Sequence, residues 1–294
     1  RADLPDLHRD KLKWLEECHK KGLRMHGQGQ TNNALIELTF EDFNGFDNTA
    51  GWRNITVGNH EERMAKMQDP ELRQALRDEF DQGIMPVGIT HGSYPNLVVG
   101  EVSDLKYEPY QGLTVGQIAE MENKHMVDAI LDLAVGDNLQ TEFTAERGRA
   151  NPALMKEIMD SPYVIPGLSD GGAHVKFSTA GSYPTVMLTW LVRDEQLMTL
   201  EEAHYKLSYL PAHMGGFQDR GFLREGIAAD IVVYDLENLK ATEPEVVHDL
   251  PGGEWRRVQK AEGYRWTIVN GEVTFEDGVP TGATPGKLLR HGRG

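Results

Sequence analysis

The first thirty residues combine a helical hydrophobic pattern with a strand pattern. Residues 9–21 place Leu12 and Leu15 on one helical face, with charged residues elsewhere, and Gly22 ends the pattern. Residues 23–30 instead alternate in the manner of a short strand. A helix, a glycine and then a strand form half of a βαβ unit, so this pattern predicts an α/β architecture.

The middle of the chain has helical segments separated by irregular ones. Residues 31–58 show no clean period and predict a loop with short helical turns. Residues 84–103 predict two β-rich runs joined by a turn that holds His91. A helix is expected to bend at Pro70. Signals for helix starts occur at three positions: Asn59, Thr114 and Asn151.

The last part of the chain changes from helix–strand alternation to antiparallel β-structure. The apolar run 163–165 predicts a short buried strand, and Thr199 starts a further helix. Residues 229–235 read as a strong strand. In residues 266–280 an Asn-Gly pair separates two β-rich runs, which is a strong signal for a two-residue hairpin. A small antiparallel sheet is therefore expected near the C-terminus.

Composition narrows the classes of partner. The 294 residues include 46 acidic and 30 basic ones, a formal net charge of −16. This charge argues against nucleic acid and against anionic membrane surfaces. No apolar run approaches the ~18 residues of a membrane span. A single cysteine, Cys18, excludes an internal disulfide and indicates a reducing compartment, which predicts a cytoplasmic protein.

The stretch 166–174, PGLSDGGAH, carries the candidate chemistry. It follows the apolar run and surrounds one acid, Asp170, with small residues. An acid at the C-terminal end of a strand, before a glycine-rich turn, is where α/β barrels keep catalytic groups. In isolation, Ser-Asp-Gly would instead be interpreted as a cap on the next element. The segments further along the chain, described below, favour Asp170 as the catalytic residue over this capping role.

Five further side chains are candidates for the substrate pocket. His26, Gln28 and Gln30 alternate, so they share one face of their strand near its C-terminal end. His174 and Lys176 follow the catalytic turn, and Lys176 offers a cation to a substrate carboxylate. A hydrogen-bonded structural histidine and a solvated lysine are the alternative interpretations.

Four segments in the second half of the chain resemble the amidohydrolase superfamily. Together they cover most of residues 161–290, in the order typical of D-aminoacylases, the N-acyl-D-amino-acid deacylases. Residues 1–160 match more loosely, as the last barrel repeats with an insertion before the final strand. The four segments are LSDGGAH, TLEEAHYKLSYLPA, DRGFLREGIAADIVVYD and IVNGEVTFEDGVPTGATPGKLLR.

The resemblance implies an α/β fold, namely the late part of a TIM-type (β/α)8 barrel with an appended antiparallel β-sandwich portion. The barrel portion would span residues 1–225, with the insertion at about 31–160, and the sandwich portion residues 226–294. It also implies one or two divalent metal ions, commonly Zn2+, with Asp170 as the metal ligand from the last strand. Such a metal lowers the pKa of bound water toward ~7, and the carboxylate carries the proton to the leaving amine.

Two features differ from that family. The chain contains no His-x-His pair, which the family carries on its first barrel strand. The metal-bearing histidines are therefore expected before Arg1 or on another chain, so a further chain or upstream segment should complete the barrel, and an oligomer is expected. After Asp170, where the family commonly has His-Pro-Arg, the chain has GGAHVKFSTAGSYPT.

The predicted function is metal-dependent hydrolysis of a C–N bond other than a peptide bond. The expected substrate is a small-molecule amide, such as an N-acyl amino acid. A cyclic amide or imide, as hydrolysed by hydantoinases and dihydroorotases, is an alternative substrate class. A non-catalytic barrel subunit that serves in binding or assembly is an alternative of a different class.

Overall fold

The computed structural model describes residues 6–31, 36–42, 44–86, 94–145 and 151–291, so His91 lies outside the described residues. The chain divides into two compact units. Unit 1 contains residues 1–33, 149–175 and 179–294, and unit 2 contains residues 34–148 and 176–178. Residues 34–148 of unit 2 lie inside the insertion expected at about 31–160, but its residues 176–178 lie outside that range. The boundary expected at residue 225 lies inside unit 1 and stays a prediction. No described helix is both long and apolar enough to cross a bilayer.

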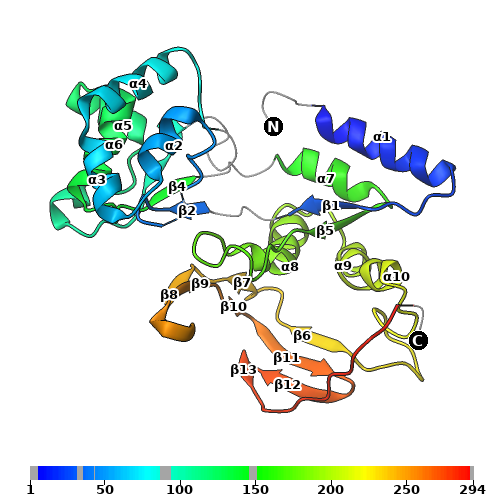
Figure 1. Cartoon of the computed structure of the whole chain (residues 1–294). Helices are drawn as coiled ribbons and strands as arrows, with labels where there is room; N and C mark the ends of the chain where they lie inside the picture. Colours follow the sequence, from blue (N-terminus) through cyan, green and yellow to red (C-terminus); the bar gives the residue numbers. More distant parts are fainter. Residues whose placement is uncertain (1–5, 32–35, 43, 87–93, 146–150, 292–294) are drawn as a thin grey trace. The chain divides into compact units, whose positions relative to one another are not determined.

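Two parallel strands form the inner layer of unit 1 (Figure 1). Strand β1, Gly27–Gln30, pairs with β5, Val164–Gly167. In this register Gly27 lies opposite Val164 and Gln30 lies opposite Gly167. Both strands occur where the hydrophobic pattern predicts them, although more than a hundred residues separate them in the sequence.

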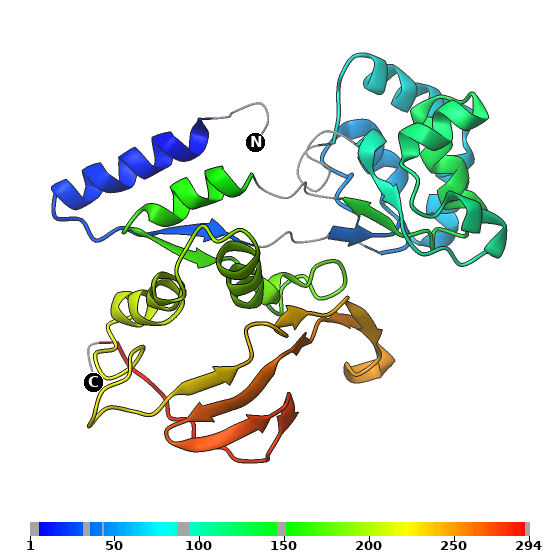
Figure 2. The same cartoon turned by 180° about the vertical axis from the view of Figure 1, so that it is seen from behind.

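Helices α1, Leu7–Lys20, and α7, Pro152–Asp160, lie on one side of this strand pair (Figures 1 and 2). Glycine allows the close approach of α7. A Cβ atom added to Gly29 would lie 2.2 Å from Met159 Cε and 3.0 Å from Ile158 Cγ2. Because Met159 is fully buried, it has little room to move away.

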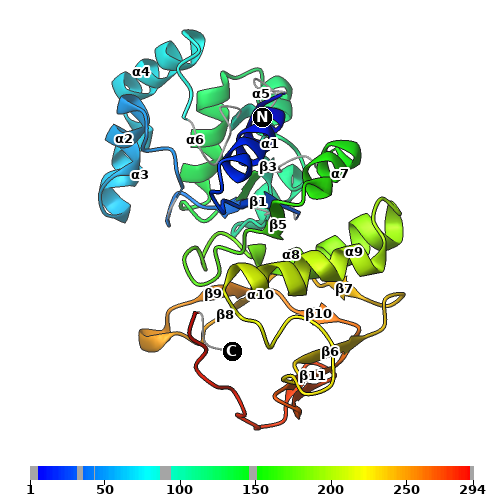
Figure 3. The same cartoon turned by 90° about the vertical axis from the view of Figure 1, so that its right-hand side faces the viewer.

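Two longer helical segments lie on the other side of the strand pair (Figure 3). After a short turn at Ala180–Ser182, helix α8, Tyr183–Val186, continues through a π-helical stretch, Met187–Asp194. Helix α9, Leu200–His204, continues through a second π-helical stretch, Tyr205–Tyr209, into α10, Leu210–Met214. One hydrophobic core joins these layers and includes Leu15, Met159, Val164, Met187, Leu188 and Leu191.

The C-terminal part of unit 1 forms the small antiparallel sheet that the sequence predicts. Its strand order is β13-β12-β11-β6. At the turn between β11 and β12, Asn270 and Gly271 have φ values of 48° and 85°, as the predicted two-residue hairpin requires. The strands are β6, Ile231–Tyr234; β11, Tyr264–Val269; β12, Glu272–Glu276; and β13, Val279–Pro280.

Four shorter strands and one turn complete unit 1. They form two separate antiparallel pairs, β7 with β10 and β8 with β9. Their bounds are β7, Lys240–Ala241; β8, Glu245–Val247; β9, Arg256–Val258; β10, Ala261–Glu262; and a 3-10 turn at Pro251–Gly253. The fold is thus mixed α/β. The described residues contain a single parallel strand pair and no closed barrel.

Unit 2 is mainly helical and carries a three-stranded antiparallel sheet of order β2-β4-β3. Its core combines aliphatic side chains with the fully buried Phe40, Phe46, Trp52 and Tyr94, so three aromatic residues of the irregular stretch 31–58 belong to a local core. The helices are α2, Ala50–Thr56; α3, His60–Gln68; α4, Pro70–Asp81; α5, Val115–Glu122; and α6, Met126–Gly136. The strands are β2, Ile36–Leu38; β3, Val98–Val99; and β4, Phe143–Ala145, with 3-10 turns at Tyr94–Asn96 and Leu105–Tyr110.

The predicted helix starts are confirmed, but the kink expected at Pro70 is wrong. Asp69 has an extended backbone with ψ of 120°, and its carboxylate accepts the Glu71 N–H at 2.8 Å, so a new helix begins there. Of the two β-rich runs expected in 84–103, the described residues contain only β3. Side-chain caps are present at all four predicted helix starts: Asn59, Thr114, Asn151 and Thr199.

We predict that Gly29→Ala destabilises the protein. The added methyl group must displace the buried Met159 side chain, and overpacking of this kind costs about 1 to 3 kcal/mol. Urea unfolding measures the change in the free energy of unfolding. Gly181→Ala is the matched control, since a Cβ atom there meets no atom within 4 Å. Equal stabilities of the two variants would contradict the prediction.

Candidate functional site

Asp170 follows the last residue of β5 by three positions, beyond the C-terminal end of the parallel pair. Its backbone has φ of 46°, a left-handed conformation that Asp tolerates better than most residues. The Ala173 N–H donates to the Asp170 carbonyl at 3.0 Å and closes a turn, and the Gly171 N–H donates to Ser169 Oγ at 3.2 Å. The chain thus changes direction shortly after β5, and the Asp170 carboxylate remains partly exposed.

His174 lies beside this carboxylate. The distance from His174 Nε2 to Asp170 Oδ2 is 3.6 Å, which is longer than a hydrogen bond. The two side chains are 45% and 40% exposed, so their attraction contributes little to stability. Both groups therefore face solvent together at the end of β5, where a small molecule has access to them.

Gln28 and Gln30 lie on the strand next to β5. Gly27 and Gly29 face the side of α1 and α7, where added Cβ atoms would meet Leu15 and Met159, so the alternating glutamines take the opposite face. Gln30 lies opposite Gly167 in the register. The Gln28 side chain lies against the same glycine, because a Cβ atom on Gly167 would be 3.2 Å from Gln28 Nε2. The structure thus brings both glutamines to the end of β5.

His26 lies at the other end of the strand pair. It precedes β1, and the next residue, Gly27, donates its N–H to the Tyr163 carbonyl at 2.9 Å. The His19 ring stacks on Tyr163 with centroids 3.8 Å apart and meets the His26 ring edge-on at 5.2 Å. The expectation that His26 joins the two glutamines near the C-terminal end is therefore wrong, because β1 begins only after it. Its role in substrate binding stays a prediction.

Lys176 belongs to unit 2, whereas Asp170 belongs to unit 1. Its ammonium group forms an ion pair with Asp42, with Nζ 3.3 Å from Oδ1. The next residue, Phe177, packs against the core of unit 2, and its carbonyl accepts the Glu37 N–H at 3.1 Å. The cation that we expected to bind a substrate carboxylate already has a carboxylate partner within its own unit.

The described residues do not form a metal site by themselves. They contain no group of three or more His, Cys, Asp and Glu side chains close enough to hold an ion. Asp170 and His174 supply one carboxylate and one imidazole, fewer than the three protein ligands typical of a catalytic zinc site.

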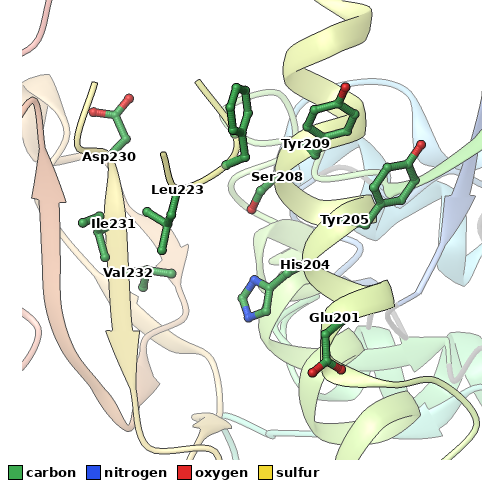
Figure 4. A pocket seen from close by; sticks show the side chains of 11 residues that line it. Glu201, His204, Tyr205, Ser208, Tyr209, Leu223, Asp230, Ile231 and Val232 are labelled. Atoms are coloured by element: carbon green, nitrogen blue, oxygen red, sulfur yellow. The ribbon is translucent and has the colours of Figure 1, made fainter. Parts of the chain in front are cut away.

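A cavity of about 720 Å³ lies elsewhere in unit 1, between the α9–α10 helix and strand β6 (Figure 4). Its polar groups include His204, whose imidazole is 2.6 Å from Tyr234 Oη and whose pKa is lowered by burial. None of the predicted site residues lines it. No hydrophobic or polar pattern predicted this cavity, because it forms only where the α9–α10 helix and β6 lie beside each other in the folded chain. The lining residues are Glu201, His204, Tyr205, Ser208, Tyr209, Gly221, Phe222, Leu223, Asp230, Ile231 and Val232.

Comparison with known proteins decides the family. A sequence profile of the amidohydrolase family matches residues 14–275, which is most of the chain. The chain belongs to the amidohydrolase family. This match confirms the resemblance to the family, and it includes the LSDGGAH segment.

This chain is similar to parts of several curated proteins. It is 34% identical over 113 residues to N-acyl-D-aspartate deacylase of Alcaligenes xylosoxydans xylosoxydans, a match covering 38% of this chain and 20% of that protein. It is 35% identical over 127 residues to N-acyl-D-glutamate deacylase of the same organism, covering 42% of this chain and 23% of that protein. The matched segments thus span less than a quarter of either relative.

A solved structure of N-acyl-D-glutamate deacylase from Bordetella bronchiseptica, complexed with zinc and a phosphonate inhibitor, is 24% identical in sequence to this chain. The match covers 67% of this chain and 38% of that chain, with a TM-score of 0.40. A TM-score of this size supports no conclusion about the fold, so the family assignment rests on the sequence match.

We predict that the surroundings of His26 make the stability of this protein depend on pH. Burial, followed by the nearby His19, His213 and Arg24, lowers the pKa of His26 from its ordinary 6.5. The folded state therefore binds fewer protons than the unfolded state, so the stabilisation is present above pH 6.5 and is lost as the pH falls through the folded-state pKa.

His26→Gln should accordingly lose less stability than the wild type between about pH 7 and about pH 5. Urea unfolding at a series of pH values measures this. His248→Gln, at an exposed histidine that directly follows β8, is the control and should keep the wild-type pH dependence. If both variants lose stability as the wild type does, His26 is not the group that titrates.

Proposed function

We propose that this chain is part of an enzyme that hydrolyses the amide bond of an N-acyl amino acid, with Asp170 as general base and general acid. The observation that carries the proposal is a partly exposed carboxylate just beyond the end of a parallel strand, with His174, Gln28 and Gln30 nearby, in a member of the amidohydrolase family. The names of the deacylase relatives suggest N-acyl-D-amino acids as the first substrate class to test.

The proposed reaction requires one proton to move twice. A water oxygen bonds to the amide carbon, and the Asp170 carboxylate accepts the proton that the water releases. The C–N bond then breaks, and Asp170 returns the proton to the leaving nitrogen. The products are a carboxylic acid and an amine. The partial exposure of Asp170 suits this role, because both the water and the leaving group need access to its oxygens.

Zn2+, as one or two ions, remains part of the proposal. Asp170 and His174 are the described residues that offer donor atoms at the end of β5, and they do not complete a metal site. The remaining ligands would have to come from residues outside the described part of this chain. The proton transfers assigned to Asp170 do not depend on how many ions bind.

We also propose that a further chain or segment completes the strand layers, as the family resemblance implies. In the described residues β1 and β5 pair only with each other, and a two-stranded sheet is only marginally stable alone. Strand β6 pairs with β11 on one side only, and its Val232 is 42% exposed. Exposed apolar edges of this kind invite pairing with another strand.

Backbone hydrogen bonds show which groups of β6 are available for this pairing. Asp235 donates its N–H to the Gly263 carbonyl at 2.8 Å, and the Ala229 carbonyl accepts the Gly271 N–H at 2.9 Å. Odd-numbered residues of this strand therefore face β11, and Val232 directs its backbone groups to the other side.

We predict that the active protein from its source contains more polypeptide than this chain. Among the described residues, the open strand edges and the incomplete set of metal ligands both support this prediction. Native mass spectrometry of the active material should find the Asp170-bearing chain within a larger covalent or non-covalent species. Full activity at the mass of this chain alone would contradict the prediction.

We predict that Asp170→Asn lowers kcat by a factor of about 10² or more, the usual scale for a positioned acid–base group. Asn tolerates the left-handed backbone at this position, so the variant should fold normally. Steady-state hydrolysis of N-acyl-D-amino acids measures kcat, with cyclic imides as the alternative substrates.

Asp160→Asn is the matched control, because Asp160 is an exposed carboxylate at the end of α7 that pairs with Lys156. It should keep wild-type turnover. Near-normal kcat in Asp170→Asn would show that Asp170 is not the acid–base group. A wild-type protein that hydrolyses neither substrate class would favour the non-catalytic alternative.

A further inference from the structure

Lys206 carries a buried charge. Its residue is 7% exposed, and it is the one buried lysine among the described residues. It lies in the π-helical stretch Tyr205–Tyr209. Such stretches are rare, and they are frequent at functional sites. No carboxylate in the described chain forms an ion pair with it, although Asp160 and Glu202 act on it at longer range.

The ammonium group instead binds two backbone carbonyls. Lys206 Nζ donates to Ser161 O at 2.6 Å and to Val164 O at 2.9 Å. Ser161 is the C-cap residue of α7, so the ammonium group lies near the negative end of that helix, where a cation is favourable. The Ser161 carbonyl also accepts the Val164 N–H at 3.3 Å, which closes the turn between the helix and β5.

The second carbonyl lies on the outer edge of β5. Gly27 of β1 donates its N–H to the Tyr163 carbonyl at 2.9 Å, so Tyr163 faces β1. Successive carbonyls of a strand point to opposite sides, and the Val164 carbonyl therefore points away from β1. Lys206 thus provides a donor where a neighbouring strand would otherwise provide one.

We propose that Lys206 is a positioning residue for Asp170, an inference that rests on the proposed function of that carboxylate. Lys206 fixes the turn between the end of α7 and the start of β5. The Asp170 carboxylate follows the C-terminal end of the same strand. The strand is only four residues long, about 13 Å, so a shift at Val164 changes the position of the whole strand against β1. A misplacement of about 1 Å in a catalytic group lowers the rate by as much as about 10².

The energetics agree with a role of this kind. Burial lowers the pKa of Lys206, which reflects the cost of keeping an ammonium group away from water. An apolar side chain of similar length would avoid that cost but would leave both carbonyls without their donor. The overall stability of such a variant therefore balances two opposing terms, and local measurements are needed to test the proposal.

The test compares Lys206→Met, Lys206→Gln and Lys206→Arg in the complete protein. Lys206→Met should accelerate amide hydrogen exchange in residues 161–167 by a factor of about 10 or more and leave α6 in unit 2 unchanged. Its kcat should fall by a factor of about 10 or more, with KM changed less than about two-fold. Lys206→Arg should restore most of both properties, since a guanidinium group can donate to two carbonyls.

The control is Lys156→Met, which removes a nearby exposed lysine from α7 and should change neither measurement. Lys206→Gln provides the comparison if the methionine variant does not fold. Exchange in 161–167 equal to that of the control, or an unchanged kcat, overturns the inference. Asp170→Asn could keep normal turnover while amide hydrogen exchange in residues 161–167 is accelerated in Lys206→Met. In that case the proposed function fails, but the conclusion that Lys206 fixes the turn between α7 and β5 stands.

Discussion

Unit 1 depends on the parallel pairing of two four-residue strands. β1 and β5 come from distant parts of the chain, so their hydrogen bonds hold together segments that unit 2 separates in the sequence. Helices cover both sides of the pair, and Gly29 allows α7 to approach it closely. All proposed chemistry follows from this pairing, because it brings Gln28 and Gln30 to the strand end that leads to Asp170.

Electrostatics differ sharply between the two ends of this strand pair. At the C-terminal end, the side chains of Asp170 and His174 are partly open to solvent, which suits groups that exchange protons with a ligand. At the other end, Lys206 is buried and bound to backbone carbonyls, which suits a group that holds the chain in place. Catalytic and stabilising roles separate in the same way between the two faces of α/β barrels.

Local features of the sequence were sufficient to predict several elements. The helix starts at Asn59 and Thr114 and the Asn270-Gly271 hairpin depend on short-range hydrogen bonds and backbone preferences, and the structure has all of them. The Pro70 prediction failed because Asp69 caps a new helix there. Which predicted site residues lie close together could not be predicted, because it depends on tertiary contacts. Alternation of polar residues does not show where β1 begins, so it placed His26 at the wrong end of the strand pair. Nor does the sequence show that Lys176 forms an ion pair with Asp42.

The tripeptide Lys176–Ser178 has a consequence for the modular use of this fold. Phe177 packs against the core of unit 2, although the residues before Lys176 and after Ser178 belong to unit 1. Unit 2 is therefore not a simple insert that can be excised at two points. Joining residue 33 directly to residue 149 would remove the core against which Phe177 packs and leave that aromatic side chain uncovered. Grafting or deletion of unit 2 must therefore include residues 176–178.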